Sequence, residues 1–593
     1  NESDETSDVS ATPDGTAPAS PTELVATTGN TQVVLTWTAN TESDLASYKV
    51  YGGTSASPTT LLSTVIGTIV THTHTGLTNG TTYYYRISAV DNVGNESTAT
   101  NDISATPYAK YTVKTDGSGD YTTIQAAIDG ASSGDSIIVY AGTYTENIDY
   151  GGKNIVVKSN SGAVATIITP SNSLQPIAYF HNSENTQTKL IGFTLSDGGS
   201  LRGSAVKISG ADPTIENCII KNCVLTNTAY GAVSFHSTAS TVKNTVFYGT
   251  TGGPAIYIDN EGDNSSIINC TIANNHIGLE ASDKVFNVKN SIIYNNTTNL
   301  NSYGFVAAEY SNIEDGLTGT GNIDSDPLFA DTANGDYRLT DYSPAIGAGT
   351  ATGAPTTDID GNPRPTTSPD MGAYENALAS QRPKAGTIAD GLTTDVDWQN
   401  STSTISANWA NFVDNGNIAT LVHEFAIGST TSNLADVVTW TTVSVDTGAG
   451  PSYTATGLSL TEGSTYYVSV RATDTDSQVS DTTTTDGVTI DATAPTIASV
   501  VEGSATVDAD YQNVADELII SWSGSDAASG ITTYEYALGT TSGGTETIDW
   551  TSTGTATADT LTGLSLTEGS TYYLSVRVTD GAGNLSDVST GDG

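Results

Sequence analysis

Ile215-Glu-Asn217-Cys-Ile-Ile220 is a stretch that recurs along the middle of the chain with small changes. Later copies are Val242-Lys-Asn244-Thr-Val-Phe247, Ile267-Ile-Asn269-Cys-Thr-Ile272 and Val288-Lys-Asn290-Ser-Ile-Ile293. An earlier copy, Leu190-Ile-Gly192-Phe-Thr-Leu195, has glycine where the others have asparagine. The marked position steps through 192, 217, 244, 269 and 290, and such a period is typical of one turn of a solenoid.

A second repeat lies between these copies. Its members are Ala205-Val-Lys-Ile208, Ala232-Val-Ser-Phe235, Ala255-Ile-Tyr-Ile258 and Gly278-Leu-Glu-Ala281. Each period therefore contains two segments in which apolar residues alternate, which is the pattern of β-strands. Such short strands bury an apolar face only when successive coils stack about 4.8 Å apart. We therefore predict a parallel β-helix.

The repeated asparagines have a physical role in this prediction. Asparagine tolerates the left-handed backbone of a tight corner, and its amide can bond to the same amide one coil above or below. We expect a structural ladder of Asn217, Asn244, Asn269 and Asn290. Two cysteines in the same repeats, Cys218 and Cys270, would lie two coils apart as small buried side chains and not as a disulfide.

The composition restricts what this chain can be. Its 593 residues are too many for one core, and its 65 acidic against 19 basic residues give a formal charge of −46. Such a charge argues against a nucleic-acid partner and makes divalent cations natural counterions. No apolar run reaches membrane-spanning length. Three cysteines without paired spacing indicate neither a zinc motif nor a disulfide framework.

We predict an all-β protein in which a right-handed parallel β-helix joins one N-terminal to two C-terminal β-sandwich domains. The predicted segments are a terminal strand and linker (1–16), a sandwich (17–107), the β-helix (108–378) and two further sandwiches (379–493 and 494–593).

The first sandwich resembles a fibronectin type III domain. Leu35-Thr-Trp37 supplies the core tryptophan, and Leu77 with Tyr83 six residues later has the spacing of the tyrosine corner of that family. The resemblance implies a spacer or adhesive unit.

The predicted β-helix begins with a short helix. Ile124, Ala127 and Ile128 share one helical face, and Thr122 with Gln125 would form a capping box, so this helix would plug the open end of the first coil. Residues 111–158 resemble the opening of pectin methylesterases and other pectin-lyase-like proteins. We find no counterpart of the catalytic motifs of the esterases or of the polygalacturonases.

Residues 326–375 resemble the end of the β-helix domain of bacterial secreted and surface-anchored proteins, and we expect them to form its C-terminal cap. Beyond this segment, Gly457–Asp474 recurs 106 residues later as Gly563–Asp580. The two C-terminal units resemble fibronectin type III or related Ig-like domains of bacterial surface proteins.

The two ends of the chain leave two hypotheses open. Residues 1–13 read like the closing strand at residues 95–107, whereas the last sandwich stops at Gly593, the counterpart of Gly487. Either the chain is an excerpt of a longer tandem array, or residues 1–13 complete the 494–593 sandwich of a neighbouring copy by strand donation. We favour the excerpt because tandem arrays are the commoner arrangement.

The outward positions of the β-helix form two predicted polar columns. They contain Lys207, Ser234, Tyr257 and Glu280, and Ser209, His236, Asp259 and Ser282. A lyase would need a carboxylate cluster beside a basic residue, and a hydrolase would need two carboxylates at a set separation. Because neither pattern is clear, we assign no catalytic residue and interpret the columns as a solvated ladder or a sugar-binding face.

Two loops at sandwich tips are candidate calcium sites. One contains Asp91 and Asn95, and the other contains Asp580 and Asn584. Oxygen ligands at close spacing suit Ca²⁺, although a solvated turn has the same sequence. Two other pairs lack the further ligands that a metal site needs: Asp358 with Asp360, and His72 with His74.

These observations predict an extracellular structural or adhesive cell-surface protein, such as a fibre, sheath, stalk or adhesin segment. It would need no cofactor, with Ca²⁺ as a possible exception, and would contact copies of itself, neighbouring domains or surface glycans. The alternative is a secreted polysaccharide-binding or polysaccharide-degrading protein, either a lyase or an esterase, with accessory sandwiches.

Overall fold

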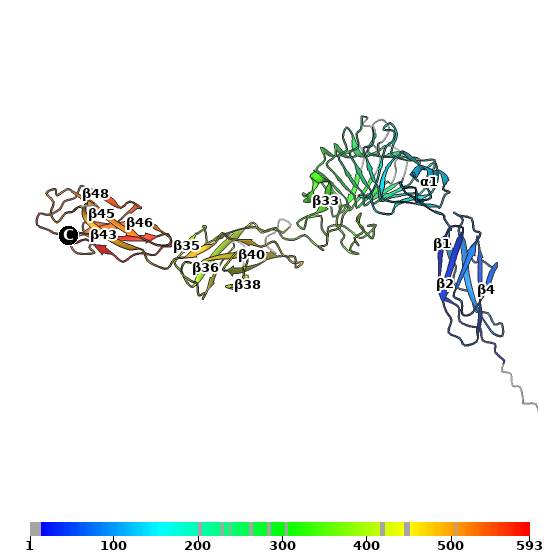
Figure 1. Cartoon of the computed structure of the whole chain (residues 1–593), viewed down its shortest axis with the longest axis horizontal. Helices are drawn as coiled ribbons and strands as arrows, with labels where there is room; N and C mark the ends of the chain where they lie inside the picture. Colours follow the sequence, from blue (N-terminus) through cyan, green and yellow to red (C-terminus); the bar gives the residue numbers. More distant parts are fainter. Residues whose placement is uncertain are drawn as a thin grey trace, which may run out of the picture. The chain divides into compact units, whose positions relative to one another are not determined.

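The computed structural model describes residues 13–199, 204–226, 230–236, 239–259, 265–281, 286–302, 306–414, 421–443, 451–504 and 507–593. The chain divides into two compact units, Asn1–Gln381 and Arg382–Gly593. The first unit contains one sandwich and the β-helix, and the second contains two sandwiches (Figure 1). Within the described residues, no helix is long and apolar enough to span a membrane.

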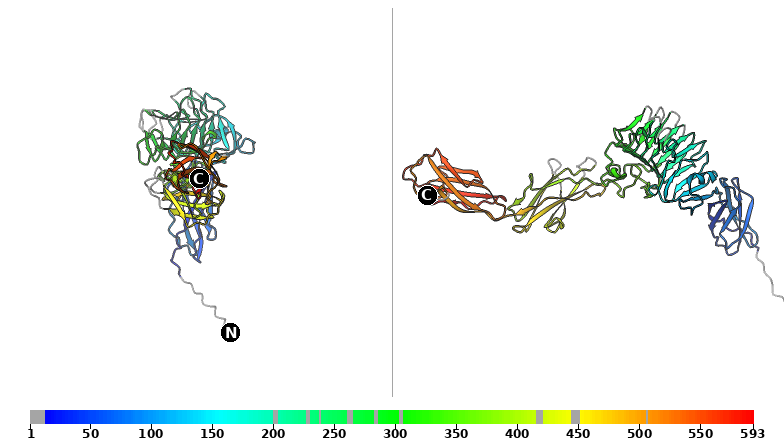
Figure 2. Two further views of the ribbon diagram at one scale, coloured as in Figure 1. Left: turned by 90° about the vertical axis from the view of Figure 1, so that its left-hand side faces the viewer. Right: turned by 45° about the horizontal axis from the view of Figure 1, so that its top comes forward.

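The β-helix consists of three parallel sheets that run along a stack of coils (Figure 2). The first sheet contains β8 (Lys110–Val113), β9 (Ser136–Val139), β12 (Val156–Ser159), β15 (Lys189–Ile191), β18 (Thr214–Glu216), β21 (Thr241–Lys243), β24 (Ser266–Ile268), β27 (Phe286–Lys289) and β30 (Val306–Glu309). The second contains β10 (Gly142–Thr145), β13 (Thr166–Thr169), β16 (Thr194–Ser196), β19 (Ile219–Lys221), β22 (Val246–Tyr248), β25 (Thr271–Ala273), β28 (Ile292–Tyr294) and β31 (Asn312–Ile313). The third contains β11 (Ile148–Asp149), β14 (Ala178–His181), β17 (Val206–Ser209), β20 (Val233–His236), β23 (Pro254–Ile258), β26 (Ile277–Ala281) and β29 (Thr298–Ser302).

The core of the β-helix is built from aligned aliphatic side chains. In the first sheet, one inward position is occupied in successive coils by Val157, Leu190, Ile215, Val242, Ile267 and Val288, all of which are buried. Burying one such side chain stabilises the fold by roughly 1.5–3 kcal/mol relative to leaving it exposed. Because no coil can bury its apolar residues alone, stability comes from the stacking of coils.

The helix α1 (Ile124–Gly130) packs against the first coils through Ile124, Ala127 and Ile128. Its N-cap is Thr123, whose side chain accepts a hydrogen bond from the Ala126 N–H. The predicted capping box of Thr122 and Gln125 is therefore wrong. The physical reason is a contact with the following coil, because the Glu146 carboxylate accepts hydrogen bonds from the backbone N–H groups of Ile124 and Gln125 at 2.8 and 2.9 Å.

The tail after the last coil contains β32 (Phe329–Asp331), a 3₁₀ turn η1 (Thr332–Asn334) and β33 (Asp336–Leu339). It does more than close the end of the stack, which is the role that the sequence predicts for it. Tyr337 and Ala373 pack against outward-facing residues of β22 and β25, and Leu339 packs near Ile292 of β28. The tail therefore covers the outer face of the second sheet over several coils.

The first sandwich has two antiparallel sheets. One contains β1 (Thr22–Gly29), β2 (Gln32–Thr38) and β5 (Thr71–Thr75), and the other contains β3 (Leu45–Gly53), β4 (Leu61–Ile66), β6 (Tyr83–Asp91) and β7 (Ile103–Ala105). Trp37 lies edge-on against Tyr48 in the core. The Tyr83 hydroxyl accepts a hydrogen bond from the Thr78 N–H at 3.1 Å, as a tyrosine corner requires.

The two C-terminal sandwiches share this plan. The strands of the first are β34 (Thr387–Asp390), β35 (Trp398–Gln399), β36 (Thr404–Ala410), β37 (Val422–Gly428), β38 (Val438–Val443), β39 (Ser452–Thr456), β40 (Thr465–Thr473), β41 (Thr483–Thr484) and β42 (Val488–Ile490). Those of the second are β43 (Thr496–Ser504), β44 (Val507–Asp508), β45 (Glu517–Ser525), β46 (Ile531–Gly539), β47 (Ile548–Gly554), β48 (Ala558–Thr562), β49 (Tyr573–Asp580) and β50 (Ser589–Thr590). Tyr466 and Tyr572 form the corresponding corners, each at 3.0 Å.

Candidate functional site

The predicted asparagine ladder lies at the corner between the first and second sheets. Asn217, Asn244, Asn269 and Asn290 have φ between 48° and 55°, and Gly192 has φ 79° at the same position. Asn244 Nδ2 donates to Asn217 Oδ1 at 3.0 Å, and Asn290 Nδ2 donates to Asn269 Oδ1 at 3.2 Å. The amides therefore bond in two pairs.

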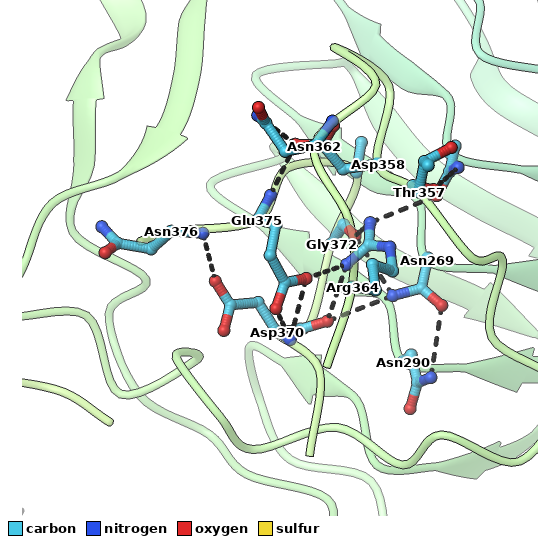
Figure 3. Close-up of polar contacts among 12 residues, drawn as sticks. Asn269, Asn290, Thr357, Asp358, Asn362, Arg364, Asp370, Gly372, Glu375 and Asn376 are labelled. Carbon is cyan, nitrogen blue, oxygen red and sulfur yellow. Dashed lines mark hydrogen bonds and ion pairs between the residues drawn. The ribbon is translucent and has the colours of Figure 1, made fainter. Parts of the chain in front are cut away.

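The tail interacts with this ladder between the two pairs. The Asn269 amide donates to the backbone carbonyls of Asp370 and Gly372 at 3.1 and 3.4 Å. Arg364 donates to the Gly372 carbonyl at 2.9 Å (Figure 3) and to Asn244 Oδ1 at 3.1 Å. A segment about 100 residues further along the chain thus completes the hydrogen bonds of the corner.

Arg364 is the centre of a buried charge cluster. It forms an ion pair with Glu375 at 2.6 Å, and the two side chains are 1% and 4% exposed. Burial raises the pKa of Asp370 to about 6 and, together with the charge of Asp370, raises the pKa of Glu375 to about 7. With Asp358 also buried, one guanidinium faces three carboxyl groups, so this cluster retains a proton near neutral pH.

A second file of asparagines, which we did not predict from the sequence, lies at the next corner. Asn222, Asn274 and Asn295 have φ between 56° and 58°, and Gly249 takes the same place with φ 71°. Beside them, buried amides form a continuous chain of contacts: Asn275 Nδ2 donates to Asn296 Oδ1, and Asn296 Nδ2 donates to Asn299 Oδ1, each at 3.0 Å. The Asn-Asn pairs at residues 274–275 and 295–296 are the signal that could have revealed it.

The first predicted polar column lies on the third sheet. Tyr179, Lys207, Ser234, Tyr257, Glu280 and Asn301 are partners in successive coils. Ser234 is fully buried and bonds to the Gly231 backbone, so it is not available to a ligand. The Lys207 ammonium lies 5.4 Å from the Tyr179 ring centre and 5.9 Å from that of Tyr230. This face therefore combines cationic and aromatic groups.

The second column contributes a His–Asp pair. His236 Nδ1 and a carboxylate oxygen of Asp259 are hydrogen-bonded, and the His236 ring contacts Tyr230 and Tyr257 with centroids 5.5 and 6.1 Å apart. Ser209 pairs with His236 in the neighbouring coil, whereas Ser282 lies outside the described residues. Further along the sheet, His181 stacks on Tyr179 at 4.3 Å. We call the six side chains the aromatic stripe: Tyr179, His181, Lys207, Tyr230, His236 and Tyr257.

The structure brings Asp91 and Asn95 together with two further aspartates. Asp91 Oδ1 accepts hydrogen bonds from the Asn95 N–H at 2.8 Å, and the Asn95 amide donates to Asp91 Oδ2 and to the Asp14 carbonyl. Oxygens of Asp14, Asp44 and Asp91 lie within 4.8 Å of one another. Burial alone would raise the pKa of Asp91, but its hydrogen bonds lower it, so the group stays ionised.

The same arrangement occurs between the two C-terminal sandwiches. Oxygens of Asp491, Asp526 and Asp580 lie within 4.8 Å of one another, and Asn584 donates to Asp580 Oδ2 and to the Asp491 carbonyl. The converging oxygens are therefore aspartate oxygens, whereas both predicted asparagines act as donors. The shared Asp-x-Thr-Ala-Pro sequence at residues 14–18 and 491–495 is a signal that could have identified the added aspartates. Calcium binding at these two clusters stays a prediction.

The weaker candidates have ordinary roles. Asp358 Oδ1 accepts the N–H groups of Asp360 and Asn362 at 3.0 and 2.7 Å, which is a turn. His72 and His74 are half-buried, and His74 Nδ1 hydrogen-bonds with the Tyr85 hydroxyl at 3.1 Å. The prediction of buried cysteines without a disulfide is confirmed, because Cys218, Cys223 and Cys270 are free and buried.

Two parts of the chain match known protein families. Residues 19–106 match the fibronectin type III domain, and residues 204–321 match the right-handed β-helix region. The chain contains a fibronectin type III domain and a right-handed β-helix. The predicted all-β fold class and these two resemblances are thereby confirmed.

Similar proteins include one curated plant protein. The probable pectinesterase/pectinesterase inhibitor 17 of Arabidopsis thaliana is 40% identical over 73 residues. This alignment covers 12% of the present chain and 14% of the plant protein, so the chain spans only a small part of that relative.

Solved structures with similarity include enzymes and isolated modules. The family 28 exopolygalacturonase of Yersinia enterocolitica is 14% identical with a TM-score of 0.17, over 54% of this chain and 90% of that chain. An Fn3-like protein from Clostridium thermocellum is 35% identical with a TM-score of 0.13, over 15% of this chain and 92% of that chain. A β-helix combined with fibronectin type III domains indicates a cell-surface or polysaccharide-related protein, and both families are commonly extracellular.

Proposed function

We propose that this protein is an extracellular structural or adhesive component of a cell surface, and that the aromatic stripe is its contact face for glycans. The observation that carries the proposal is the stripe itself. Tyrosine offers a large, rigid and amphipathic surface at low conformational cost, which suits a sugar ring with one apolar face and a polar edge. The aromatic rings supply the apolar contacts, and Lys207 and the His236–Asp259 pair supply the polar ones.

The scaffold under the stripe supports this function. Tyr179, Lys207 and Tyr257 project from strands of one parallel sheet whose inner side chains are buried in the core of the β-helix. Binding groups on such strands lose little conformational entropy when a ligand binds. A repeated sheet also presents its side chains at the spacing of the coils, so an extended polymer fits it better than a compact ligand does.

A polysaccharide-degrading enzyme is the second candidate, and the short match to a pectinesterase favours it. The His236–Asp259 pair could serve as a base oriented by a carboxylate. Screening lyase, esterase and hydrolase activity on acidic glycans, with and without Ca²⁺, tests this candidate. Activity that is lost in His236→Ala or Asp259→Ala would establish the enzyme and overturn the non-catalytic proposal.

Glycan binding is tested with the full chain on immobilised acidic and neutral polysaccharides. We expect Tyr179→Ala with Tyr257→Ala to weaken binding at least tenfold, because both rings lose their contact area. The matched control is Tyr511→Ala, which removes a tyrosine that is 94% exposed on the last sandwich. Equal binding by the wild type, the double variant and the control would contradict the assignment of the stripe.

A further inference from the structure

An acidic cluster that we did not predict from the sequence lies inside the sandwich of residues 382–493. Asp390 ends β34, Asp395 follows in the next turn, and Asp486 lies just before β42. One carboxylate oxygen of each residue lies within 4.8 Å of those of the other two. Asp390 is fully buried, whereas Asp395 and Asp486 are exposed, so the cluster is open to solvent on one side.

The buried carboxylate of this cluster is incompletely satisfied. The Asp390 carboxylate interacts with the Thr485 hydroxyl, and its Oδ2 accepts a hydrogen bond from the Gly487 N–H at 3.2 Å, but the buried Oδ1 has no hydrogen-bond partner among the described residues. Asp395 Oδ1 accepts the backbone N–H of Asp390 at 3.1 Å, which fixes the second carboxylate next to the first. An unpaired buried oxygen of an ionisable group is costly, and three carboxylates at this distance repel one another.

The next sandwich contains the same cluster. Glu502 is 5% exposed, and its Oε2 has no hydrogen-bond partner among the described residues. Oxygens of Glu502, Asp508 and Asp592 again lie within 4.8 Å of one another. Asp592 follows Asp486 by 106 residues, which is the spacing of the long repeat in these two domains. Both repeats thus have the cluster with one unsatisfied buried oxygen, although the buried acid is aspartate in the first and glutamate in the second.

The backbone around the two clusters is also equivalent. In each domain, the buried acid is followed by a glycine with positive φ, Gly391 at 90° and Gly503 at 139°. The acid near the last strand is likewise followed by a glycine, Gly487 at 108° and Gly593 at 94°. Glycines with positive φ allow the two chain segments to turn close to each other, so that the carboxylates converge.

We propose that each C-terminal sandwich binds one Ca²⁺ between these segments, through Asp390, Asp395 and Asp486 in the first and Glu502, Asp508 and Asp592 in the second. Ca²⁺ takes six to eight oxygen ligands in a flexible geometry, so three carboxylates leave positions for backbone carbonyls and water. The ion balances the repulsion and supplies the missing partner of the buried oxygen. Glu502 also lines a groove of about 700 Å³, which gives the ion a route from solvent.

A protonated acid is the competing explanation of the buried oxygen. Burial, followed by the charges of Asp395 and Asp486, raises the pKa of Asp390 to about 7, against the opposing Thr485 hydroxyl and Gly487 N–H. A proton would satisfy Asp390 without any metal, whereas an ion requires all three carboxylates. The two explanations therefore differ in the effect of changing exposed members of the clusters, such as Asp395 and Asp508.

The test is calorimetric titration of CaCl₂ into the metal-free full chain at pH 7.5. The variant Asp395→Asn with Asp508→Asn leaves both buried acids in place, and we expect it to lose two bound ions or to bind them at least tenfold more weakly. The control, Asp476→Asn with Asp587→Asn, removes the same charge from two exposed loops of these domains and should keep the wild-type stoichiometry.

A second measurement uses the buried acids themselves. Ca²⁺ should raise the thermal midpoint of the wild type, and this increase should be smaller in Asp390→Asn with Glu502→Gln. If these residues only carry protons, the amide variant would respond to Ca²⁺ like the wild type, and the Asp395→Asn/Asp508→Asn variant would bind the same number of ions. Either result would overturn the proposal, and neither depends on whether the aromatic stripe binds glycans.

Discussion

Arg364 shows how a single residue joins two parts of the β-helix domain. Its guanidinium pairs with Glu375, donates to Asn244 of the ladder and donates to the Gly372 carbonyl in the tail. Such a buried cation is expensive to desolvate, and its pairing offsets that cost only while all partners are present. The ion pair as a whole therefore adds little net stability, whereas loss of the cation alone is costly.

Replacing Arg364 by alanine leaves Glu375 and Asp370 buried without their cation. We expect Arg364→Ala to lower the free energy of unfolding of the β-helix by about 3–5 kcal/mol, measured by urea unfolding and far-UV circular dichroism. The control is Lys289→Ala, which removes a partly exposed ion pair to Glu309 at 3.6 Å and should cost about 0–1 kcal/mol. Equal losses in both variants would show that the buried cluster has no special role.

At the scale of the element, the coil corner depends on a backbone conformation that most residues avoid. Asn269 is fully buried with φ 51°, and its amide holds the tail through Asp370 and Gly372. A non-glycine residue in this conformation costs about 1–2 kcal/mol, apart from the lost hydrogen bonds. Asn269 thus stabilises the corner in two ways, by tolerating the positive φ and by donating hydrogen bonds to the tail.

Two substitutions at Asn269 separate these contributions. We expect Asn269→Ala to destabilise the β-helix by about 2–4 kcal/mol, because it loses both the amide and the tolerance for positive φ. Asn269→Gly retains the conformation, as Gly192 does at the corresponding corner, and should cost roughly half as much. Urea midpoints of the two variants provide the comparison, and a glycine variant that is less stable than the alanine variant would contradict this account.

At the scale of the whole molecule, net charge is the main influence on how stability depends on pH. A formal charge of −46 makes the compact chain repel itself, and this repulsion weakens as the pH falls. The buried cluster adds a local effect of the same sign. The pKa of Glu375 is raised to about 7 in the folded state. Between about pH 4 and 7 the native state therefore holds a proton that the unfolded state has already released, and the free energy of unfolding falls as the pH rises through this range.

We therefore expect the β-helix to become less stable as the pH rises from 5 to 7.5. All six tryptophans lie in the sandwich segments and not in residues 108–378, so far-UV circular dichroism with tryptophan fluorescence distinguishes the β-helix transition from the others. Glu375→Gln removes the local proton but not the global charge, and should reduce the slope of the unfolding free energy against pH. An unchanged slope would contradict the contribution assigned to Glu375.

The sequence alone was sufficient for the repeated elements. A period near 25 residues, alternating apolar positions and an asparagine at one corner of most coils specify stacked coils, because every coil must bury the same apolar positions and turn at the same places. The core tryptophan and tyrosine-corner spacing of the first sandwich, and the recurrence of Gly457–Asp474 as Gly563–Asp580, likewise identify the sandwiches from local pattern. Local pattern and tertiary fold agree wherever neighbouring repeats contact one another.

Only the tertiary structure decided the contacts between distant segments. The sequence is compatible with a tail at the end of the stack or along its side. The hydrogen bond from Arg364 to Asn244 and the packing of Ala373 against β25 place it along the side. The clusters around Asp91 and Asp390 likewise combine loops that are far apart in sequence. Such contacts depend on how loops close in three dimensions, and no periodic pattern along the chain records that geometry.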